Sequence, residues 1–418
     1  MVKVFLVSAI PKTMRAVVYR GVNDLRLETV PVPRIGAHEL LVKVAVCGVC
    51  PTDIKKIQHG TVPPPRIFGH ETAGTIVKIG ANRTSLEIPS PSGWERVVAG
   101  RVRIGDRVAL HHHIPCLDCH FCRHRAFAQC ETYKRTGITA GFEPAGGGYA
   151  EYVRVMPFVL PGVVKIPAKN SFEEGAMLEP VNTVLKAVRR LNLLRGDAVL
   201  VAGQGPIGLM FTRLLQLQGV RVLATDLLAS RLRLAKKFGA RWTRLAESRA
   251  PRVEGKKFPT LDPGLSSLDA AIVAVPSDTV VQEALQLVRP GGQILLFAHT
   301  RRSMNDRSRR SDAKADKLAK LSSLSAAGGG EGRGEVAALD PRPSSLDFSS
   351  ICLDEKDLIG SYSSDFTLQR EVARLVFSRQ LDVRRLITHR FPLEQTAAAV
   401  QLAARPTPDS LKILVTQS

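Results

Sequence analysis

The stretch AVLVAGQGPIGLMFTRLLQLQG, residues 198–219, joins an apolar run of strand length to a helical segment through a glycine-rich turn. In this context the pattern G-x-G-x-x-G is typical of a turn that holds the pyrophosphate of a dinucleotide. The first glycine allows the tight turn, the second lets the backbone approach the phosphates, and the third lets helix and strand pack closely. The helix N-terminus adds unpaired N–H groups and partial positive charge. We therefore predict a dinucleotide site at Gly203, Gly205, Pro206, Ile207 and Gly208.

An acidic residue, Asp226, ends the next apolar run, at the distance where a carboxylate binds the hydroxyls of the adenosine ribose. A carboxylate there would repel a 2′-phosphate, so the sequence favours NAD over NADP. The positive charge of the nearby Arg231 would instead favour the 2′-phosphate of NADP. We include Arg231 among the predicted cofactor residues. The alternative for the whole stretch is a glycine turn that binds no ligand.

The sequence has two regions with different patterns of predicted secondary structure. From Met14 to about Ile166, short Val- and Ile-rich runs separated by Gly and Pro predict a β-rich region. Between 171 and 194 the spacing is helical, with Ser171 and Glu174 as a capping box. Apolar runs at 198–202, 220–225, 270–275 and 293–297 then alternate with helical segments, which predicts a parallel sheet with crossover helices. A chain of 418 residues of this kind is expected to be α/β and to hold two domains.

Four cysteines lie close together in CLDCHFCRHRAFAQC, separated by two, two and seven residues. Four thiolates saturate a tetrahedral zinc ion and leave no position for a substrate. We therefore predict a structural zinc site that holds a loop in shape, in preference to a redox centre. Its ligands are Cys116, Cys119, Cys122 and Cys130. The neighbouring histidines are interpreted as surrounding polar residues; they are His111, His112, His113, His120 and His124.

Three residues far apart in the sequence are candidates for a catalytic metal site: Cys50 in AVCGVCPTD, His70 in FGHETAG and Glu179 in MLEP. One thiolate, one imidazole and one carboxylate would leave the fourth position of a zinc ion open for water or an alcohol. Each residue alone is ambiguous, because a lone histidine is more often structural than metal-binding.

Seven motifs occur in a single order: CGVCPTD, GHETAG, GDRV, the four-cysteine loop, GGGYAEYV, LEP and GQGPIG. Together they resemble the zinc-containing medium-chain dehydrogenase/reductase family, over Met14 to about Arg301 and over Ile351 to Lys412. The resemblance implies a GroES-like β-rich catalytic domain and a Rossmann domain, which is a doubly wound parallel sheet that binds NAD. We expect the first domain at 1–180 plus 366–418 and the second at 181–365.

The resemblance also implies roles for single residues. The cysteine before the x-Thr-Asp triplet is the family's ligand, which favours Cys50 over Cys47, with His70 as the second ligand. Glu71 and Glu179 match the acidic pair of the polyol and threonine dehydrogenase branch, and they are expected to exchange at the metal.

A proton relay is implied as well. Thr52 matches the relay hydroxyl, and Asp53 is placed to orient a ligand histidine. The outer half of the relay departs from the family pattern, because Lys55 stands where relatives often place a histidine and Pro51 replaces glycine or arginine. His59 is the alternative outer group.

The activity that the resemblance implies is zinc-dependent transfer of hydride from a polyol or secondary alcohol to NAD. It further implies two zinc ions per chain and a homodimer or homotetramer. Two alternatives remain open at this point. One is a threonine dehydrogenase-like or amino-cyclitol oxidoreductase. The other is a dehydrogenase fold without activity that binds nucleic acid through a basic insert.

The net charge of +21 raises the question of nucleic acid, but no nucleic-acid motif accompanies it. We interpret the charge as scattered over the surface, with one basic insert at about 301–345, where eight basic and three acidic residues lie between Arg301 and Lys320. We predict that this insert is disordered. Clustered cysteines favour a reducing, cytoplasmic location. No apolar run reaches the roughly 20 residues of a membrane helix, and a signal peptide is not expected. The first 13 residues are interpreted as an extension or a misplaced start.

Overall fold

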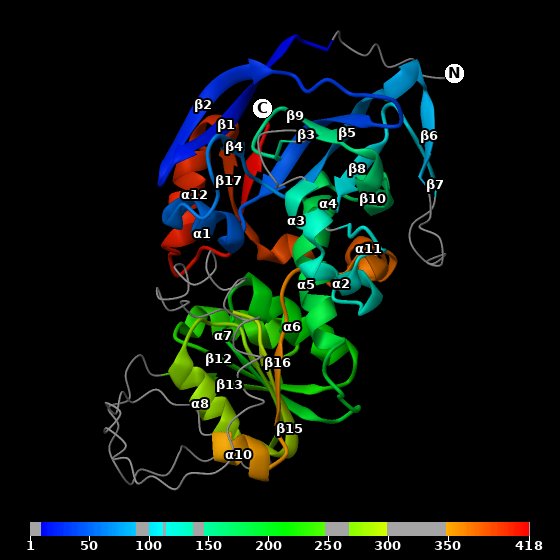
Figure 1. The fold of residues 1–418 in the computed structure, drawn as a ribbon. Coiled ribbons are helices and arrows are strands. Elements are labelled where there is room, and N and C mark those ends of the chain that lie inside the picture. The colour runs from blue at the N-terminus through cyan, green and yellow to red at the C-terminus, as the bar shows by residue number, and fades with distance from the viewer. Residues whose placement is uncertain are drawn as a thin grey trace, which may run out of the picture.

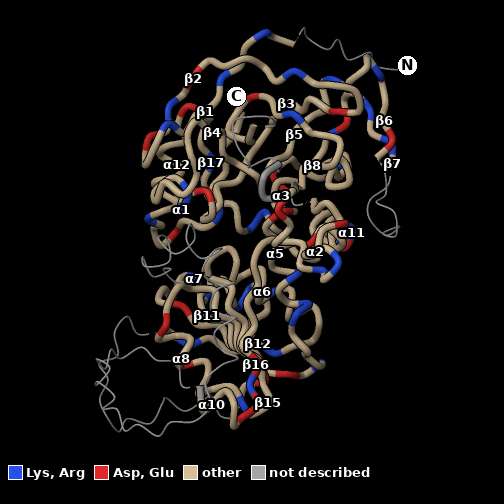
Figure 2. Tube along the Cα trace, viewed as in Figure 1, with Lys and Arg blue, Asp and Glu red and all other residues tan. Residues whose placement is uncertain are grey.

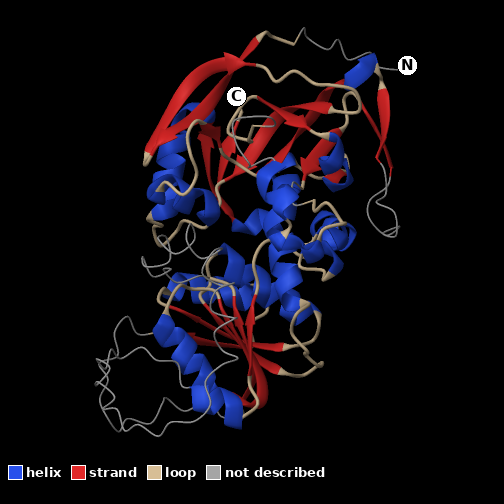
Figure 3. Ribbon diagram, in the orientation of Figure 1, coloured by secondary structure: helices blue, strands red, loops and turns tan. Residues whose placement is uncertain are grey.

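The computed structural model describes residues 10–88, 100–111, 114–136, 146–246, 267–298 and 348–417. Three predictions concern residues outside these ranges: the basic insert at 301–345, the pair His112 and His113, and most of the extension ahead of Met14. The described chain forms a β-rich part and a part built on one parallel sheet (Figure 1). The first and last described strands, β1 (Thr13–Gly21) and β18 (Lys412–Thr416), both belong to the β-rich part (Figure 3).

The β-rich part is organised around a mixed sheet whose middle strand is β3 (Leu40–Gly48). β5 (Glu71–Ile79) and β9 (Tyr152–Val155) pair with β3 in antiparallel fashion, as does β18 (Lys412–Thr416) from the end of the chain. The sheet continues through β8 (Arg107–Leu110) and β10 (Val163–Lys165) on one side and β17 (Ile387–Pro392) on the other. Two smaller sheets complete this part: β1 (Thr13–Gly21), β2 (Asp24–Pro31) and β4 (Arg66–Ile67), and β6 (Ser85–Ile88) with β7 (Gly100–Arg103).

The second part is a six-stranded sheet in which every neighbouring pair is parallel. Its order is β13 (Trp242–Leu245), β12 (Arg221–Asp226), β11 (Ala198–Ala202), β14 (Leu268–Val273), β15 (Val288–Leu296) and β16 (Asp357–Gly360). The four apolar runs predicted as strands are β11, β12, β14 and β15, and crossover helices connect them. The prediction of an α/β chain with a doubly wound parallel sheet is thus confirmed.

The helices lie around these sheets. In the β-rich part they are α1 (Pro51–His59), α2 (His120–Arg123), α3 (Glu131–Thr136), α4 (Phe172–Ala176), α11 (Gln369–Phe377) and α12 (Thr396–Ala404). Around the parallel sheet they are α6 (Pro206–Leu217), α7 (Ala229–Lys237), α8 (Asp278–Leu287) and α10 (Phe348–Leu353). Between the two parts runs α5 (Leu178–Val188) (Figure 1).

The helical stretch predicted over 171–194 is two helices, α4 and α5, that meet at Met177. The predicted capping box is present at the start of α4, where Ser171 Oγ accepts the N–H of Glu174 and Glu174 Oε2 accepts the N–H of Ser171. The new start at Leu178 places Pro180 in the first turn of α5. Proline is tolerated there because N–H groups in the first turn have no partner within the helix.

One apolar cluster crosses from the β-rich sheet to the parallel sheet through α5. It includes Val46 and Ala73 on the first sheet, Val181 and Leu185 on α5, and Val199 on the second sheet, together with many neighbours. Burial of each such leucine or valine stabilises the fold by about 1.5–3 kcal/mol. The cluster therefore fixes α5 against both parts of the molecule.

Lys and Arg are spread over elements of both parts and are interspersed with Asp and Glu (Figure 2). None of the helices in the described ranges combines the length and hydropathy that a bilayer crossing requires.

Candidate metal and dinucleotide sites

The first candidate site forms where the end of β3 meets the beginning of β5. The antiparallel register pairs Gly48 with Glu71, and Cys50 follows as the N-cap residue of α1. Gly48 is required here, because a Cβ at this position would lie 1.8 Å from Glu71 Oε2. The missing side chain lets the carboxylate of Glu71 lie across the strand end, toward Cys50.

The structure brings Cys50, His70 and Glu71 together, and we call these residues the metal group. One potential ligand atom from each lies within 4.8 Å of the other two. His70 and Glu71 are buried, at 4% and 1% exposure, and Cys50 is half-buried. Thiolate, imidazole and carboxylate are the ligand types that zinc takes in proteins, so the donor chemistry fits this ion.

Glu179, the second residue of α5, lies outside the metal group but close to it. Burial raises the pKa of Glu179 to about 7, with His70 lowering it and Glu71 raising it. These charges act on Glu179 because α5 begins beside the metal group. A carboxyl group that titrates near neutrality can change between a neutral and an ionised form at this position.

Asp53 lies behind the metal group, completely buried, with Oδ2 3.1 Å from Nδ1 of His70. Burial alone would lower the pKa of His70, but the charges of Asp53 and Cys50 raise it well above its usual value. The same pairing lowers the pKa of Asp53 against the effect of burial. Asp53 therefore fixes the orientation of the imidazole ring.

Sequence reasoning missed Lys412, which is buried beside the metal group. Its ammonium group forms an ion pair with Glu71 Oε2 and donates to the carbonyl of Val49 at 3.0 Å. Burial lowers the pKa of Lys412, but the charges of Glu71 and Cys50 outweigh that effect and raise it. The only signal in the sequence was a lysine at the start of the apolar run LKILVTQ. Lys412 offsets the negative charge that Cys50 and the two glutamates concentrate here.

Cys47 points away from the metal group into the interior. Its Sγ lies 3.4 Å from Thr72 Oγ1, and burial raises its pKa to about 12. A thiol of this kind remains protonated at neutral pH and is a poor metal ligand.

The predicted relay residues lie along α1. Thr52 is half-buried in the first turn, next to Cys50. Burial lowers the pKa of Lys55, and the charge of Cys50 opposes this shift, so Lys55 is within electrostatic reach of the metal group. His59 is exposed at the other end of α1, nine residues after Cys50 and about 13 Å away along the helix axis. Lys55, which replaces the histidine of the relatives, is nearer to Cys50 along α1 than His59, the predicted alternative.

A second residue that the sequence did not reveal is Tyr133. It is half-buried, and its hydroxyl lies 3.2 Å from Ser363 Oγ. Burial raises the pKa of Tyr133, and the charges of Glu179 and His70 also act on it. Ser363 belongs to the segment that follows β16, so Tyr133 connects this segment to the surroundings of the metal group.

The four predicted structural ligands also come together. One sulfur from each of Cys116, Cys119, Cys122 and Cys130 lies within 4.8 Å of the others. Two backbone N–H groups donate to these sulfurs, from Cys119 to Cys116 at 3.4 Å and from Cys116 to Cys130 at 3.3 Å. Burial opposes ionisation of Cys116, but N–H groups of the loop lower its pKa to about 6. A closed set of four thiolates fits zinc.

The described histidines around this loop have other contacts. The rings of His120 and His124 have their centroids 4.5 Å apart. His111 is buried, with Nε2 3.4 Å from Ser364 Oγ, and burial lowers its pKa to about 3. None of the three belongs to a group of potential metal ligands among the described residues.

The glycine turn follows β11, as predicted. Gly203 has φ of 91°, and a Cβ at Gly208 would lie 1.7 Å from the carbonyl oxygen of Gly203. Gly205 is the N-cap residue of α6, and a Cβ there would meet no atom within 4 Å. Pro206 and Ile207 form the first turn of α6. The open space in front of Gly205, beside a helix N-terminus, fits a pyrophosphate group.

Asp226 lies at the end of β12, beside the glycine turn. Its carboxylate accepts the N–H of Gln204 at 2.7 Å and the N–H of Leu228 at 2.9 Å. Arg231 Nη1 lies 3.9 Å from Asp226 Oδ2. A carboxylate has about four acceptor positions, so Asp226 keeps capacity for a ribose hydroxyl.

Two family models match this chain, and several known proteins are similar to it. Residues 36–168 match the alcohol dehydrogenase GroES-like domain, and residues 206–331 match the zinc-binding dehydrogenase family. Sorbitol dehydrogenase of Gallus gallus is 26% identical over 396 residues, which are 93% of this chain and 93% of that protein. D-xylulose reductase A of Aspergillus oryzae is 28% identical over 298 residues, covering 68% of this chain and 76% of the relative.

Solved structures with a similar fold include proteins bound to NADP and to NAD. A Sinorhizobium meliloti protein bound to NADP superposes with a TM-score of 0.71 at 25% identity, covering 97% of this chain and 100% of that one. Acetophenone reductase from Geotrichum candidum, in complex with NAD, has the same fold, with a TM-score of 0.70 at 20% identity and coverage of 98% and 99%. With both family matches in order along one chain, this protein belongs to the zinc-containing medium-chain dehydrogenase family.

Proposed function

We propose that this protein is a zinc-dependent polyol or secondary-alcohol dehydrogenase that transfers hydride to NAD. The observation that carries the proposal is the metal group of Cys50, His70 and Glu71. It lies beside the helix α5, which packs on the helix of the glycine turn through a shared apolar core. The relatives named for sorbitol and xylulose chemistry favour a polyol over an amino acid, so the threonine dehydrogenase alternative is not supported.

The residues proposed to hold the catalytic zinc are Cys50, His70 and Glu179, with Glu71 as an exchanging partner. Four cysteines, Cys116, Cys119, Cys122 and Cys130, would hold a second, structural ion, so two zinc ions per chain are expected. Zinc supplies Lewis acidity toward a substrate hydroxyl, and NAD supplies the hydride acceptor. Three observations support this assignment: the donor types, the mutual distances of Cys50, His70 and Glu71, and the burial of His70, Glu71 and Glu179.

The protein's own residues have separate tasks in this scheme. Asp53 holds the His70 ring, and Lys412 holds the Glu71 carboxylate and offsets its charge. Thr52 is placed to accept the proton that leaves the substrate hydroxyl. We infer that Lys55 rather than His59 passes it on, because Lys55 lies five residues after Cys50 on α1 and His59 lies nine residues after it.

The dinucleotide would lie over the glycine turn. Its pyrophosphate would contact Gly203, Gly205, Pro206, Ile207 and Gly208, and its adenosine ribose would contact Asp226. The buried carboxylate of Asp226 supports NAD over NADP, since it would repel a 2′-phosphate. Arg231 lies close enough to reduce that repulsion, so we propose a preference for NAD that is incomplete.

We further propose domain boundaries at 1–180 plus 366–418 and at 181–365. The strands β17 and β18 support this division, because they belong to the β-rich sheet although they follow the parallel sheet in sequence. A homodimer or homotetramer is proposed through the sheet edge at β16, where Leu358 and nearby Leu353 are exposed. All seven cysteines lie in the described ranges and none is in a disulfide, which supports a cytoplasmic location.

The deciding experiment is a panel of polyols, cyclitols, secondary alcohols and L-threonine, followed by absorbance of NADH. We expect NADH from a polyol or secondary alcohol and a loss of at least a hundredfold in kcat/KM for Cys50→Ala. The matched control is Cys47→Ala, which removes a neighbouring thiol outside the metal group and should keep substantial activity. Absence of NADH formation from every member, with salt-sensitive binding to DNA, would favour the nucleic-acid alternative.

A further inference from the structure

A pocket of about 1020 Å³ continues the proposed dinucleotide cleft beyond the glycine turn, at the carboxyl ends of β14, β15 and β16. Val275 joins the two, because it lines the pocket and its Cγ1 lies 2.5 Å from the position that a Cβ of Gly203 would take. The order of the strands reverses between β11 and β14, and a dinucleotide lies across such a point with one nucleoside on each side. Asp226 marks the adenosine side at β12, so the proposed function assigns the pocket to the nicotinamide side.

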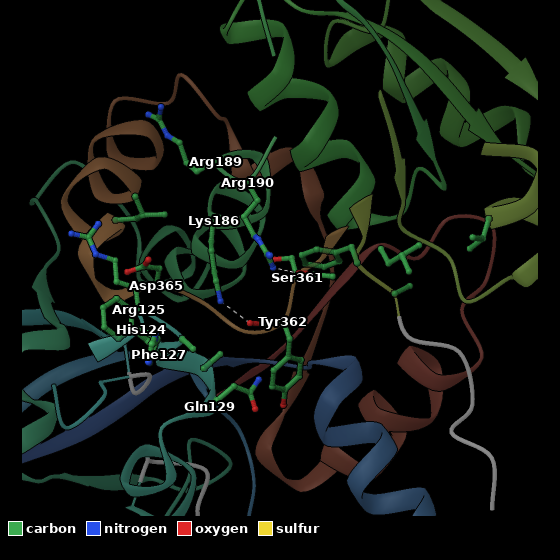
Figure 4. Close-up of a pocket in the computed structure, with 18 of the residues that line it drawn as sticks. His124, Arg125, Phe127, Gln129, Lys186, Arg189, Arg190, Ser361, Tyr362 and Asp365 are labelled. Carbon is green, nitrogen blue, oxygen red and sulfur yellow. Dashed lines mark hydrogen bonds between the residues drawn. The ribbon is translucent and has the colours of Figure 1, made fainter. Parts of the chain in front are cut away.

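One wall of the pocket belongs to the segment 360–365, which begins at the end of β16 and which we call the strap (Figure 4). A row of polar side chains from α5 contacts this strap. Its members follow one another by four residues, which is the spacing of neighbours along a helix surface. The row begins inside α5 and ends in the turn after it, and we call it the α5 row: Asn182, Lys186 and Arg190.

Each member of the α5 row makes a hydrogen bond to the main chain of the strap. Arg190 donates to the carbonyl of Gly360, and Lys186 donates to the carbonyl of Tyr362 at 2.8 Å. The side-chain oxygen of the asparagine accepts the N–H of Asp365 at 2.8 Å. Figure 4 shows the two basic side chains directed at the strap. The strap thus runs antiparallel to α5 and is held at its beginning, middle and end.

The serine side chains of the strap differ in their contacts. Two of them attach it to the β-rich part: Ser363 Oγ lies 3.2 Å from the hydroxyl of Tyr133, and Ser364 Oγ lies 3.4 Å from Nε2 of His111. Ser361 lines the pocket and is only 7% exposed, yet its hydroxyl has no hydrogen-bond partner among the described residues. A buried polar group without a partner is uncommon and needs an explanation. A polar ligand group in the pocket would supply the partner that Ser361 lacks.

We propose that the α5 row positions the nicotinamide half of the cofactor: it holds the strap so that the hydroxyl of Ser361 binds the carboxamide of the nicotinamide ring. The inference rests on the proposed function and adds to it the residues that orient the ring. A carboxamide both donates and accepts hydrogen bonds, and a serine hydroxyl can serve either role. Neither Lys186 nor Arg190 forms an ion pair within the described ranges. Their charged donors therefore act on the strap, where they make stronger hydrogen bonds than neutral donors would.

Binding of NADH and of ADP-ribose to the full chain loaded with zinc, measured by calorimetry, tests the contact, because ADP-ribose lacks only the nicotinamide ring. Ser361→Ala should weaken NADH binding roughly three- to tenfold, the effect of one lost hydrogen bond, and leave ADP-ribose binding unchanged. Without cofactor the variant should melt no lower than the wild type, because the lost hydroxyl has no partner in the described structure. Ser85→Ala on β6 is the matched control and should alter neither ligand. Equal effects of Ser361→Ala on the two ligands, or none, would overturn the contact.

Lys186→Met tests the α5 row with the same two ligands. We expect NADH affinity to fall about tenfold and ADP-ribose affinity to stay within about twofold, because a charged donor to the strap is lost. Lys186→Arg keeps a charged donor and should recover most of the NADH affinity, and the exposed Lys78→Met on β5 should change neither ligand.

If Lys186→Met did not fold, Arg190→Gln would remove another member of the row and allow the same comparison. A parallel fall in both affinities, or no recovery in Lys186→Arg, would overturn the positioning role and leave the dehydrogenase intact. A wild-type protein that binds neither NADH nor ADP-ribose would reject the dinucleotide cleft, and with it both the proposed function and this inference.

Discussion

The carboxylate of Asp53 lies 3.1 Å from Nδ1 of His70, and both side chains are buried. The pairing leaves only Nε2 of the ring to face Cys50 and Glu71. It also raises the pKa of His70 well above its usual value, although burial opposes this. A ring held in this way presents one nitrogen in a fixed direction, which is what a metal site needs from a histidine ligand.

Asp53→Asn should therefore weaken zinc binding at the metal group without unfolding the protein. Loss of an outer-shell carboxylate typically costs about 10–100-fold in metal affinity or activity. Competition with a chelator, followed by metal analysis, measures the change. Asp118→Asn serves as control, since its side chain is 90% exposed on the four-cysteine loop. Zinc affinity equal to that of the wild type in the Asp53→Asn variant would remove Asp53 from this role.

Lys412→Met should destabilise the protein, because it leaves Glu71 buried without its ion-pair partner. Breaking a buried pair by removing one member typically costs about 3–5 kcal/mol. Denaturant unfolding of the chelator-treated protein gives the free energy. Adding Glu71→Gln to the variant should recover part of the loss, because no uncompensated charge then remains. Lys43→Met, on the exposed face of β3, should change the free energy little; a loss as large as that of Lys412→Met would mean that the ion pair is not the cause.

The parts of this molecule that the sequence predicted are those whose residues lie close together in the chain. The glycine turn and the four-cysteine loop each form within one short segment, so spacing alone indicates their chemistry. The parallel sheet was predictable because its strands are apolar throughout and separated by helices.

The ion pair of Lys412 with Glu71 and the contact of Tyr133 with Ser363 could not be predicted in this way. Each joins residues that only the folded sheets bring together, and neither lysine nor tyrosine stands in a distinctive motif. The break between α4 and α5 was missed for a different reason: the apolar spacing continues through Met177, and only the position of Pro180 indicates a new start.

Cys119→Ala should release one of two zinc ions per chain and loosen the four-cysteine loop. Three thiolates no longer close the tetrahedron, and a structural zinc contributes directly to folding free energy. Metal analysis of dialysed protein and the melting temperature measure both effects. Cys352→Ala, which removes an exposed cysteine far from both metal sites, should change neither. A protein that keeps two zinc ions after the first substitution would contradict the structural assignment.

Gly205→Ala and Gly208→Ala form a matched pair. A Cβ at Gly208 would strike the carbonyl of Gly203, whereas a Cβ at Gly205 would enter open space. We expect Gly208→Ala to lower stability and NAD affinity together. Gly205→Ala should cost less than about 1 kcal/mol of stability but weaken NAD binding at least tenfold. Melting temperature and fluorescence titration with NADH separate the two effects. Equal NADH affinity in wild type and Gly205→Ala would argue that the pyrophosphate lies elsewhere.

The pH dependence of the free energy of unfolding should reveal the titration of the Glu179 carboxyl group. Burial raises its folded pKa from the ordinary value of 4.5 to about 7, so the folded protein binds a proton that the unfolded chain releases between these values. Its contribution to stability is complete below pH 4.5 and is lost as pH rises through 7. In chelator-treated protein, Glu179→Gln should exceed the wild type by less than about 1 kcal/mol near pH 5 and by on the order of 3 kcal/mol near pH 8.

Zinc should reverse the sign of this difference in stability between wild type and Glu179→Gln, because a carboxyl group must be ionised to bind the metal. In zinc-loaded protein the wild type should therefore gain stability over Glu179→Gln as pH rises through 7. Urea unfolding at pH 5 and pH 8, with and without zinc, gives all four comparisons. If the difference between wild type and Glu179→Gln did not change with pH in the chelated protein, the carboxyl group would not be titrating near neutrality. If zinc left that difference unaltered at pH 8, Glu179 would not be a ligand.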